Sequence, residues 1–323
     1  MAYSEQVLRR AQARLAQARA DHESETNARI EGLYRQYPRL REIDLALRRS
    51  VAQAVSAAFR KGQDPAAAIA SIREENLSLQ REREWLLEAN DLDEGALEAS
   101  PICPHCGGTG YVGAAMCECL QELCRQEQKK ELSSLLGGKE TFDQFRLDYY
   151  PAEPDPQMGV SPRMLMQNTF QHCRRYAREF HRKSPSLLFT GGPGLGKTFL
   201  SACIARTVAD SGFSVVYDTA GKLFSDFEAV KFGGDRSDLT RKYLECDLLI
   251  IDDLGTEMTT QFTQSVLYQV INTRLMEEKP VIVSTNLTTE AISHRYSGPI
   301  ASRLLGSYQL CPFLGRDIRQ LRR

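Results

Sequence analysis

The second half of the chain is organised around one stretch, Gly191-Gly192-Pro193-Gly194-Leu195-Gly196-Lys197-Thr198, which fits the pattern G-x-x-x-x-G-K-[ST]. An apolar run, residues 186–190, precedes it, and residues 199–206 follow with apolar side chains at helical spacing. This order predicts a strand, a glycine-rich turn and a helix, in which backbone N–H groups and the helix N-terminus face a phosphate. Lys197 would reach the β- and γ-phosphates, and the Thr198 hydroxyl would ligate Mg²⁺. The stretch therefore predicts binding of a nucleoside triphosphate rather than a glycine-rich turn without a ligand.

The rest of this half alternates between predicted strands and predicted helices. Apolar runs at 213–217, 246–253, 280–286 and 308–313 read as strands, and residues 220–232 and 261–277 read as helices. Strands that alternate with helices in this way form a parallel sheet covered on both faces. The fold class that follows is α/β.

Two acids, Asp252 and Asp253, end the buried run 246–253, as in a Walker B motif. The carboxyl end of such a strand emerges beside the phosphate loop, where ligands bind in sheets of this kind. We assign Asp252 as the Mg²⁺ ligand and Asp253 as the group that polarises the attacking water, a role that Glu257 could share. Asn286 ends the run 280–286 and is placed to orient the same water.

The first part of the chain, from residue 4 to about residue 90, reads as helix throughout. Breaks are predicted at Tyr37-Pro38, where proline suits the first position of a helix, and at residues 61–65, where a Gly ends one helix and Asp-Pro begins the next. The three segments predict a helical hairpin or a small bundle. A solvated coiled coil is the alternative, because composition does not say whether the apolar faces meet each other or a partner.

Four cysteines follow in the order C-x2-C, ten residues, C-x-C, namely Cys103, Cys106, Cys117 and Cys119. Two such pairs on either side of a glycine-rich turn bring four thiolates within tetrahedral reach of one Zn²⁺. C-x-C is tighter than the usual second pair, so His105 and Cys124 are possible substitutes. A redox C-x-x-C is the competing interpretation, but it would not need the second pair.

Composition limits the possible partners and compartments. The 323 residues include 41 basic and 42 acidic side chains, so the chain has no global field that would attract nucleic acid. No apolar run approaches the ~20 residues that span a bilayer, and the first residues are too polar for a signal peptide. Nine cysteines without an export signal favour reduced thiols or a metal site. We therefore expect a cytoplasmic protein.

Several stretches together resemble a known family. The phosphate loop is followed by residues 251–257 (IDDLGTE), 284–287 (STNL), 300–304 (IASRL) and 315–319 (GRDIR). This succession is similar to that of the AAA+ ATPases of the DnaC/DnaI/IstB group, the bacterial replicative-helicase loaders and their transposon-borne relatives. The match covers residues from about 141 to the end. The cysteine stretch and the helices before it resemble, more weakly, the N-terminal region of Gram-positive-type loaders.

The resemblance implies an AAA+ P-loop domain at 161–323 with a reduced or absent C-terminal lid, since the chain stops four residues after Arg319. Before it we expect an all-α partner-binding region at 1–100, a zinc knuckle at 101–125 and a linker at 126–160. Arg303 matches the arginine finger that enters a neighbouring subunit's nucleotide site. A guanidinium supplied in this way is worth ~10³–10⁵ in rate. Arg319 resembles the second sensor, an arginine near the γ-phosphate of its own chain.

The resemblance also implies a function, that of an ATPase that loads a hexameric replicative helicase onto single-stranded DNA and associates with itself through the AAA+ domain. The alternative is an IstB-like ATPase that assists a transposase on duplex DNA. The N-terminal zinc module favours the loader, because simpler transposon helpers begin nearer their ATPase core. A binding module that uses ATP only as an assembly switch is a third possibility.

Overall fold

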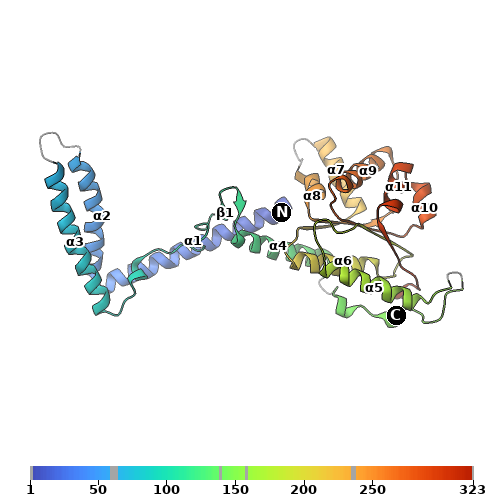
Figure 1. Ribbon diagram of the computed structural model, residues 1–323, viewed down its shortest axis with the longest axis horizontal. Coiled ribbons are helices and arrows are strands. Elements are labelled where there is room, and N and C mark those ends of the chain that lie inside the picture. Colours follow the sequence, from blue (N-terminus) through green and yellow to red (C-terminus); the bar gives the residue numbers. More distant parts are fainter. Residues whose placement is uncertain (1–2, 59–64, 138–139, 157–158, 234–237, 322–323) are drawn as a thin grey trace. The chain divides into compact units, whose positions relative to one another are not determined.

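In the computed structural model of the protein (Figure 1), the structure describes residues 3–58, 65–137, 140–156, 159–233 and 238–321. The chain divides into two compact units. One comprises residues 1–12 and 118–323, and the other comprises residues 13–117. Each unit is described by itself.

The apolar runs of the larger unit form one five-stranded parallel sheet. Parallel pairing places the carboxyl ends of all five strands at the same edge, so that Thr190 lies opposite Thr285 and Leu254 also pairs with Thr285. The phosphate loop and the acids therefore emerge together, as the sequence predicts. The spatial order of the strands is β4 (Val215–Thr219), β5 (Leu248–Leu254), β6 (Val281–Thr285), β3 (Leu187–Thr190) and β7 (Gln309–Pro312).

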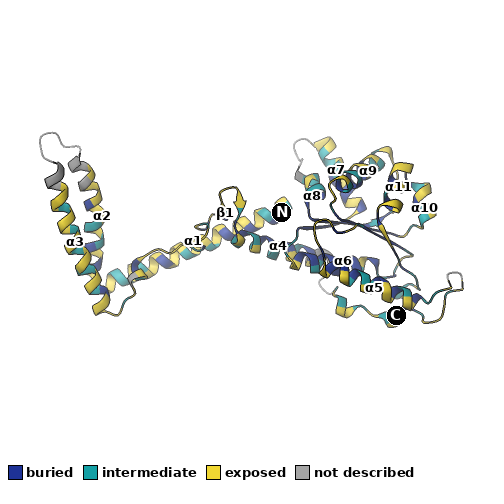
Figure 2. Ribbon diagram, in the orientation of Figure 1, coloured by how far each residue is buried: buried dark blue, intermediate teal, exposed yellow. Residues whose placement is uncertain are grey.

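Helices cover both faces of this sheet (Figure 1). Successive strand residues alternate between two cores: Phe189 packs into one core and Leu188 into the other. This two-sided burial explains why the inner strands β3 and β6 are fully buried (Figure 2), without the alternation of exposed residues found in one-sided sheets. One face carries α5 (Pro162–Arg178) and α6 (Lys197–Asp210). The other carries α7 (Ala220–Gly233), α8 (Asp238–Glu245), α9 (Gln261–Met276), α10 (Thr289–Arg295) and α11 (Gly298–Gly306).

Helix α4 (Glu118–Leu136) packs against α6, and one of its side chains reaches the edge strand β4. The Gln128 side-chain amide donates to the Phe213 carbonyl oxygen at 2.9 Å and accepts from the Val215 N–H at 3.0 Å. The amide thus takes the place of a further strand and satisfies backbone groups that an edge strand leaves unpaired. Leu132 of α4 is buried in the α5–α6 core.

Short elements complete the unit around the phosphate loop. The 3₁₀ turns η2 (Phe142–Gln144) and η3 (Leu147–Tyr149) precede α5, and their aromatic side chains pack against the α5–α6 core. Within the described residues, the one helix that follows β7 is α12 (Ile318–Leu321), of four residues.

The smaller unit is mainly helical. From residue 13 onward, helix α1 (Glu5–Gln36) belongs to this unit, and it ends where the break at Tyr37-Pro38 was predicted. Helices α2 (Pro38–Ala58) and α3 (Pro65–Ala89) follow. The predicted turn at 61–65 lies, apart from its last residue, outside the described residues. A small core between the helices contains Leu40, Leu87 and Leu97, and Arg83 pairs with Asp44 at 3.0 Å. The helical hairpin is therefore confirmed, because α2 and α3 pack against each other.

Candidate functional site

The turn between β3 and α6 is held by a segment from far along the chain. Gly194, in this turn, has φ +70°. A Cβ at this position would overlap the Asp317 carboxylate, and the positive φ also favours glycine. The Gly194 carbonyl oxygen also accepts a hydrogen bond from the Ile318 N–H at 3.1 Å. The segment that carries the predicted sensor arginine therefore packs directly on the phosphate loop.

Lys197 is buried at the start of α6 and uses all three of its N–H donors. Its Nζ donates to the carbonyl oxygens of Gly191 at 2.7 Å and Gly192 at 2.6 Å, and to Asn286 Oδ1 at 2.7 Å. Burial lowers the pKa of the Lys197 ammonium group, and the Asp253 carboxylate opposes this shift. The lysine thus links the phosphate loop to the end of β6, and phosphate oxygens could replace these acceptors.

The two acids at the end of β5 have different surroundings. Asp252 is 4% exposed, and its carboxylate accepts hydrogen bonds from the Tyr217 hydroxyl at 2.8 Å and from the Ser284 hydroxyl. Asp253 has φ +55°, a left-handed conformation that is uncommon outside glycine. Burial, followed by the charge of Asp252, raises the pKa of the Asp253 carboxyl. Asp253 lines the open pocket, whereas Asp252 is buried and is not among the lining residues.

One pocket of about 500 Å³ brings most of the predicted residues together. Asp253 and Asn286 lie on its strand side, and Arg319 comes from α12. Arg303 does not belong to this lining. The predicted site residues that line the pocket are Pro193, Gly194, Leu195, Gly196, Lys197, Thr198, Asp253, Asn286 and Arg319.

The pocket also has an aromatic side that we did not predict from the sequence. Phe145, Tyr149 and Tyr150 line it, from the stretch interpreted as part of a linker. The Tyr150 hydroxyl donates to the Leu195 carbonyl oxygen at 2.8 Å, and the Phe145 ring stacks on the Tyr150 ring with centroids 5.9 Å apart. Flat apolar rings beside a phosphate loop can bind a nucleobase. The high density of aromatic residues in 142–150 is the sequence feature that could have predicted this side of the pocket.

Glu257, the alternative to Asp253 as the acid that polarises the water, forms hydrogen bonds within the fold. One carboxylate oxygen accepts the Gly255 N–H at 2.7 Å, and the other accepts the Tyr296 hydroxyl at 2.6 Å. The side chain is 5% exposed, and Arg295 donates to the backbone carbonyl oxygen of the same residue. Glu257 therefore ties the turn after β5 to α10, and it is not among the pocket residues.

Arg303 lies on α11 and is bonded within its own chain. Its guanidinium donates to Asn272 and Tyr268 of α9 and to the Pro299 carbonyl oxygen. These contacts leave it partly exposed, outside the pocket of its own chain. Such a placement is compatible with action on another molecule.

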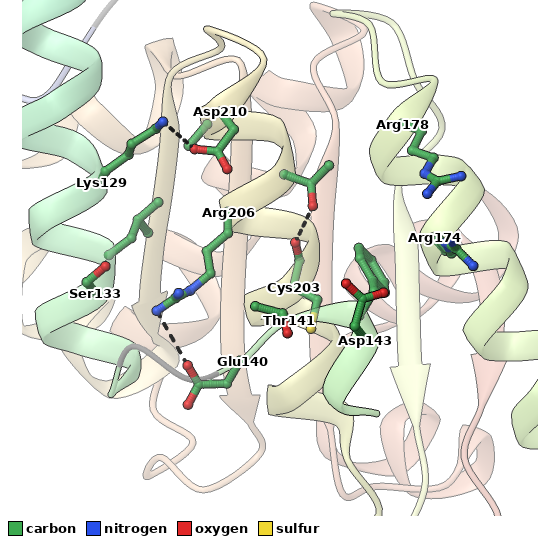
Figure 3. A pocket seen from close by; sticks show the side chains of 14 residues that line it. Lys129, Ser133, Glu140, Thr141, Asp143, Arg174, Arg178, Cys203, Arg206 and Asp210 are labelled. Carbon is green, nitrogen blue, oxygen red and sulfur yellow. Dashed lines mark hydrogen bonds and ion pairs between the residues drawn. The ribbon is translucent and has the colours of Figure 1, made fainter. Parts of the chain in front are cut away.

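A second pocket, of about 410 Å³, lies among α4, α5 and α6 (Figure 3). Lys129 pairs with Asp210 at 2.7 Å, and Arg206 lies 3.6 Å from Glu140. Figure 3 shows these opposite charges turned toward each other, so much of the positive charge in the pocket is neutralised. The phosphate loop does not contribute to this pocket, which makes it unlike the first.

The four predicted metal ligands form one cluster. The sulfurs of Cys103, Cys106, Cys117 and Cys119 all lie within 4.8 Å of one another. The distance between Cys103 Sγ and Cys117 Sγ is 3.8 Å, and tetrahedral zinc with Zn–S bonds of ~2.3 Å requires sulfurs ~3.8 Å apart. The four-cysteine donor set therefore fits Zn²⁺. His105 is exposed and Cys124 is fully buried, and among the described residues neither is part of this group.

The local backbone supports this cysteine cluster. Strands β1 (Tyr111–Val112) and β2 (Ala115–Met116) form a small hairpin between the two cysteine pairs. The Gly110 N–H donates to Cys106 Sγ at 3.3 Å, and the Cys117 N–H donates to the Gly110 carbonyl oxygen at 2.8 Å. Bonds of this kind orient thiolate ligands. The remaining cysteines, Cys173, Cys203, Cys246 and Cys311, are buried.

Comparison with known proteins gives consistent matches. Residues 169–303 match the family described as IstB-like ATP binding protein. The replicative helicase loader DnaC of Buchnera aphidicola subsp. Acyrthosiphon pisum is 25% identical over 175 residues, 52% of this chain and 67% of that protein. The DnaC loader of Escherichia coli K12 is 25% identical over 139 residues, 42% of this chain and 57% of that protein. The match thus leaves a third or more of each of these relatives uncovered.

Among solved structures, the DnaC helicase loader superposes with a TM-score of 0.46 and 18% identity, covering 54% of this chain and 97% of that one. The parallel sheet, the phosphate loop and the two acids define the larger unit as a P-loop ATP-binding domain. Within that class, it is similar to the IstB-like ATP binding family over residues 169–303 and to the DnaC helicase loaders.

Proposed function

We propose that this protein is an ATP-dependent loader of the replicative DNA helicase, acting on single-stranded DNA during replication initiation or restart. One observation carries the proposal: a pocket that gathers Lys197, Asp253, Asn286 and Arg319 belongs to a domain whose relatives are named replicative helicase loaders. The domain type supports ATP binding. Hydrolysis, the DNA and the helicase are the further steps that we propose.

In the bound state, the backbone N–H groups of the phosphate loop and Lys197 hold the β- and γ-phosphates. Thr198 and Asp252 would hold Mg²⁺, which offsets negative charge on those phosphates. Oxygen donors suit this ion. In addition, the hydrogen-bond donors to the Asp252 carboxylate are two neutral hydroxyls, so this buried acid favours a nearby cation.

Four further groups promote hydrolysis in this proposal. Asp253 accepts a proton from the attacking water, or orients it, from the rim of the pocket. Asn286 becomes free to bind that water when Lys197 exchanges the Asn286 oxygen for phosphate. Arg319 stabilises negative charge within the same chain, and Arg303 does so from a second copy of the chain.

The smaller unit would bind the helicase partner. The cysteine cluster would hold Zn²⁺ and thereby fix residues 103–119. The helical region would contact a hexameric helicase, and the exposed apolar side chains of the α2–α3 hairpin, such as Val51 and Trp85, suit such a contact. None of the described helices is long and apolar enough to cross a bilayer. We propose a cytoplasmic site of action.

A loading experiment tests the proposal. The hexameric helicase of the same organism, circular single-stranded DNA and the purified chain are mixed with ATP, and DNA-bound helicase is measured. We expect at least about a tenfold increase that the Lys197→Ala variant does not produce. Lys183→Ala, which removes an exposed lysine paired with Glu278, is the matched control. Equal helicase binding with and without the chain would contradict the loader role.

An IstB-like transposase helper is the second candidate, because the matching family carries that name. The two roles require different DNA. A loader should hydrolyse ATP faster with single-stranded DNA, whereas a transposase helper should respond to duplex DNA. Stimulation by duplex DNA alone would favour the helper.

A further inference from the structure

We propose that Tyr268 and Asn272 are positioning residues that hold the Arg303 guanidinium ready for the nucleotide of a second copy of this chain. This inference rests on the proposed function, in which Arg303 acts between copies. It adds the two side chains that fix the direction of that arginine.

The contacts are specific to each nitrogen of the guanidinium. Nε of Arg303 donates to Asn272 Oδ1 at 2.9 Å, and Nη2 donates to the Tyr268 hydroxyl at 3.1 Å. The guanidinium carbon lies 4.6 Å from the centroid of the Tyr268 ring, within cation–π range. Nη1 donates to the Pro299 carbonyl oxygen at 3.0 Å. One side chain is thus held by a hydrogen bond at each of its three nitrogens and by contact with a ring.

The spacing along α9 explains how these partners come together. Tyr268 and Asn272 are four residues apart, so they lie on one face of the helix. Gln264, one turn earlier, accepts the Ser297 N–H at 3.1 Å, next to the first turn of α11. This row of polar side chains therefore fixes both the start of α11 and the arginine that α11 carries.

This arrangement leaves the Arg303 guanidinium able to bind phosphate oxygens. A guanidinium has five N–H donors, and the three bonds leave two of them for phosphate oxygens. All three acceptors are neutral, and within the described parts of the chain no carboxylate forms an ion pair with Arg303. A carboxylate partner would neutralise the charge that phosphates need, whereas a hydroxyl, an amide and a carbonyl group orient it without doing so. Tyr268 is 37% exposed, so the part of α9 that holds Arg303 lies at the surface.

A mixing experiment separates positioning from general damage. Lys197→Ala chains keep Arg303 but lack a working nucleotide site. Arg303→Ala chains keep the nucleotide site but lack the arginine. Turnover in a mixture then comes from the nucleotide sites of Arg303→Ala chains that face Arg303 of a Lys197→Ala chain. Tyr268→Ala is added either to the Lys197→Ala chain, which donates the arginine, or to the Arg303→Ala chain, which receives it.

We expect Tyr268→Ala to lower the turnover of the mixture about tenfold in the donor chain, because a displaced catalytic group loses rate steeply. In the recipient chain, where Arg303 is already absent, the same change lowers turnover by less than about twofold. Asn272→Ala in the donor chain should cost about fivefold and Tyr268→Phe, which keeps the ring, about threefold. The fall should persist at saturating protein concentration, which separates a lower kcat from weaker assembly.

The outcomes distinguish the two proposals. An inactive parent mixture would overturn the action of Arg303 between copies, and the positioning role with it. An active parent mixture that loses turnover equally with Tyr268→Ala in either chain would overturn the positioning role alone. Full turnover with Tyr268→Ala in the donor chain would do the same.

Discussion

The nucleotide pocket and the α2–α3 hairpin represent two ways in which sequence determines structure. In the pocket, Lys197 bonds to Gly191, Gly192 and Asn286, so each residue type is required by a particular partner. In the hairpin, a small apolar core suffices, and Val51 and Trp85 remain 66% and 64% exposed. Substitutions should therefore abolish function in the first region, and should act on stability or on a partner in the second.

The largest effect is expected for Lys197→Ala. Losing a cation with several hydrogen bonds to phosphate should raise the Kd for ATP about 10³-fold or more and remove hydrolysis. Titration with a fluorescent ATP analogue measures the Kd. Lys183→Ala serves as the control, since that lysine is 74% exposed. Normal ATP affinity of Lys197→Ala would mean that the pocket is not the nucleotide site.

The next largest effect separates the two acids. Asp253→Asn should keep ATP binding and lower the rate of hydrolysis about 10²–10³-fold, because the pocket loses its proton acceptor. Glu257→Gln should retain hydrolysis within about threefold, since the Glu257 carboxylate bonds to Gly255 and Tyr296 instead. Release of phosphate under saturating ATP measures both. If the two variants exchanged these results, Glu257 would be the catalytic acid.

The cysteine cluster gives a third, local effect. Purified protein should carry one Zn²⁺ per chain, and Cys103→Ser should lose the metal and unfold residues 101–125, because a structural zinc site folds with its metal. Metal analysis and hydrogen exchange measure the two consequences. ATP binding should be spared. His105→Ala, at an exposed position beside the cluster, should keep the zinc, and zinc-free reduced wild-type protein would refute the site.

The smallest effect tests the hairpin. Trp85→Ala should change the free energy of unfolding by less than about 0.5 kcal/mol, as for most surface substitutions. Leu87→Ala, two residues away and 1% exposed, should cost about 2–5 kcal/mol. Denaturant unfolding measures both values. A large loss for Trp85→Ala would show that this face is buried in the free protein.

The sequence predicted the parts of the site whose chemistry is local. The phosphate loop and Asp253 follow fixed spacings, and parallel pairing brings their strand ends together. The aromatic side of the pocket was not predicted, because the packing of Tyr150 on Leu195 is a tertiary contact that no spacing encodes. The same holds for the contact of Arg303 with Tyr268.

The sequence pattern also did not predict the backbone geometry of the site. Two acids in a row predict a cation site, but not that Asp253 adopts φ +55° while Asp252 turns toward two hydroxyls. Likewise, the spacing of the cysteines left His105 and Cys124 open as ligands. The distances between sulfurs favour the set of four cysteines.

We propose that hydrolysis in this pocket is completed by Arg303 of a second copy. The most direct test is the rate of ATP hydrolysis per chain, measured over a wide range of protein concentrations with single-stranded DNA present. We predict that the rate per chain rises with concentration for the wild type and stays low for Arg303→Ala, although both bind ATP equally. A wild-type rate per chain that is independent of concentration, and matched by Arg303→Ala, would contradict the claim.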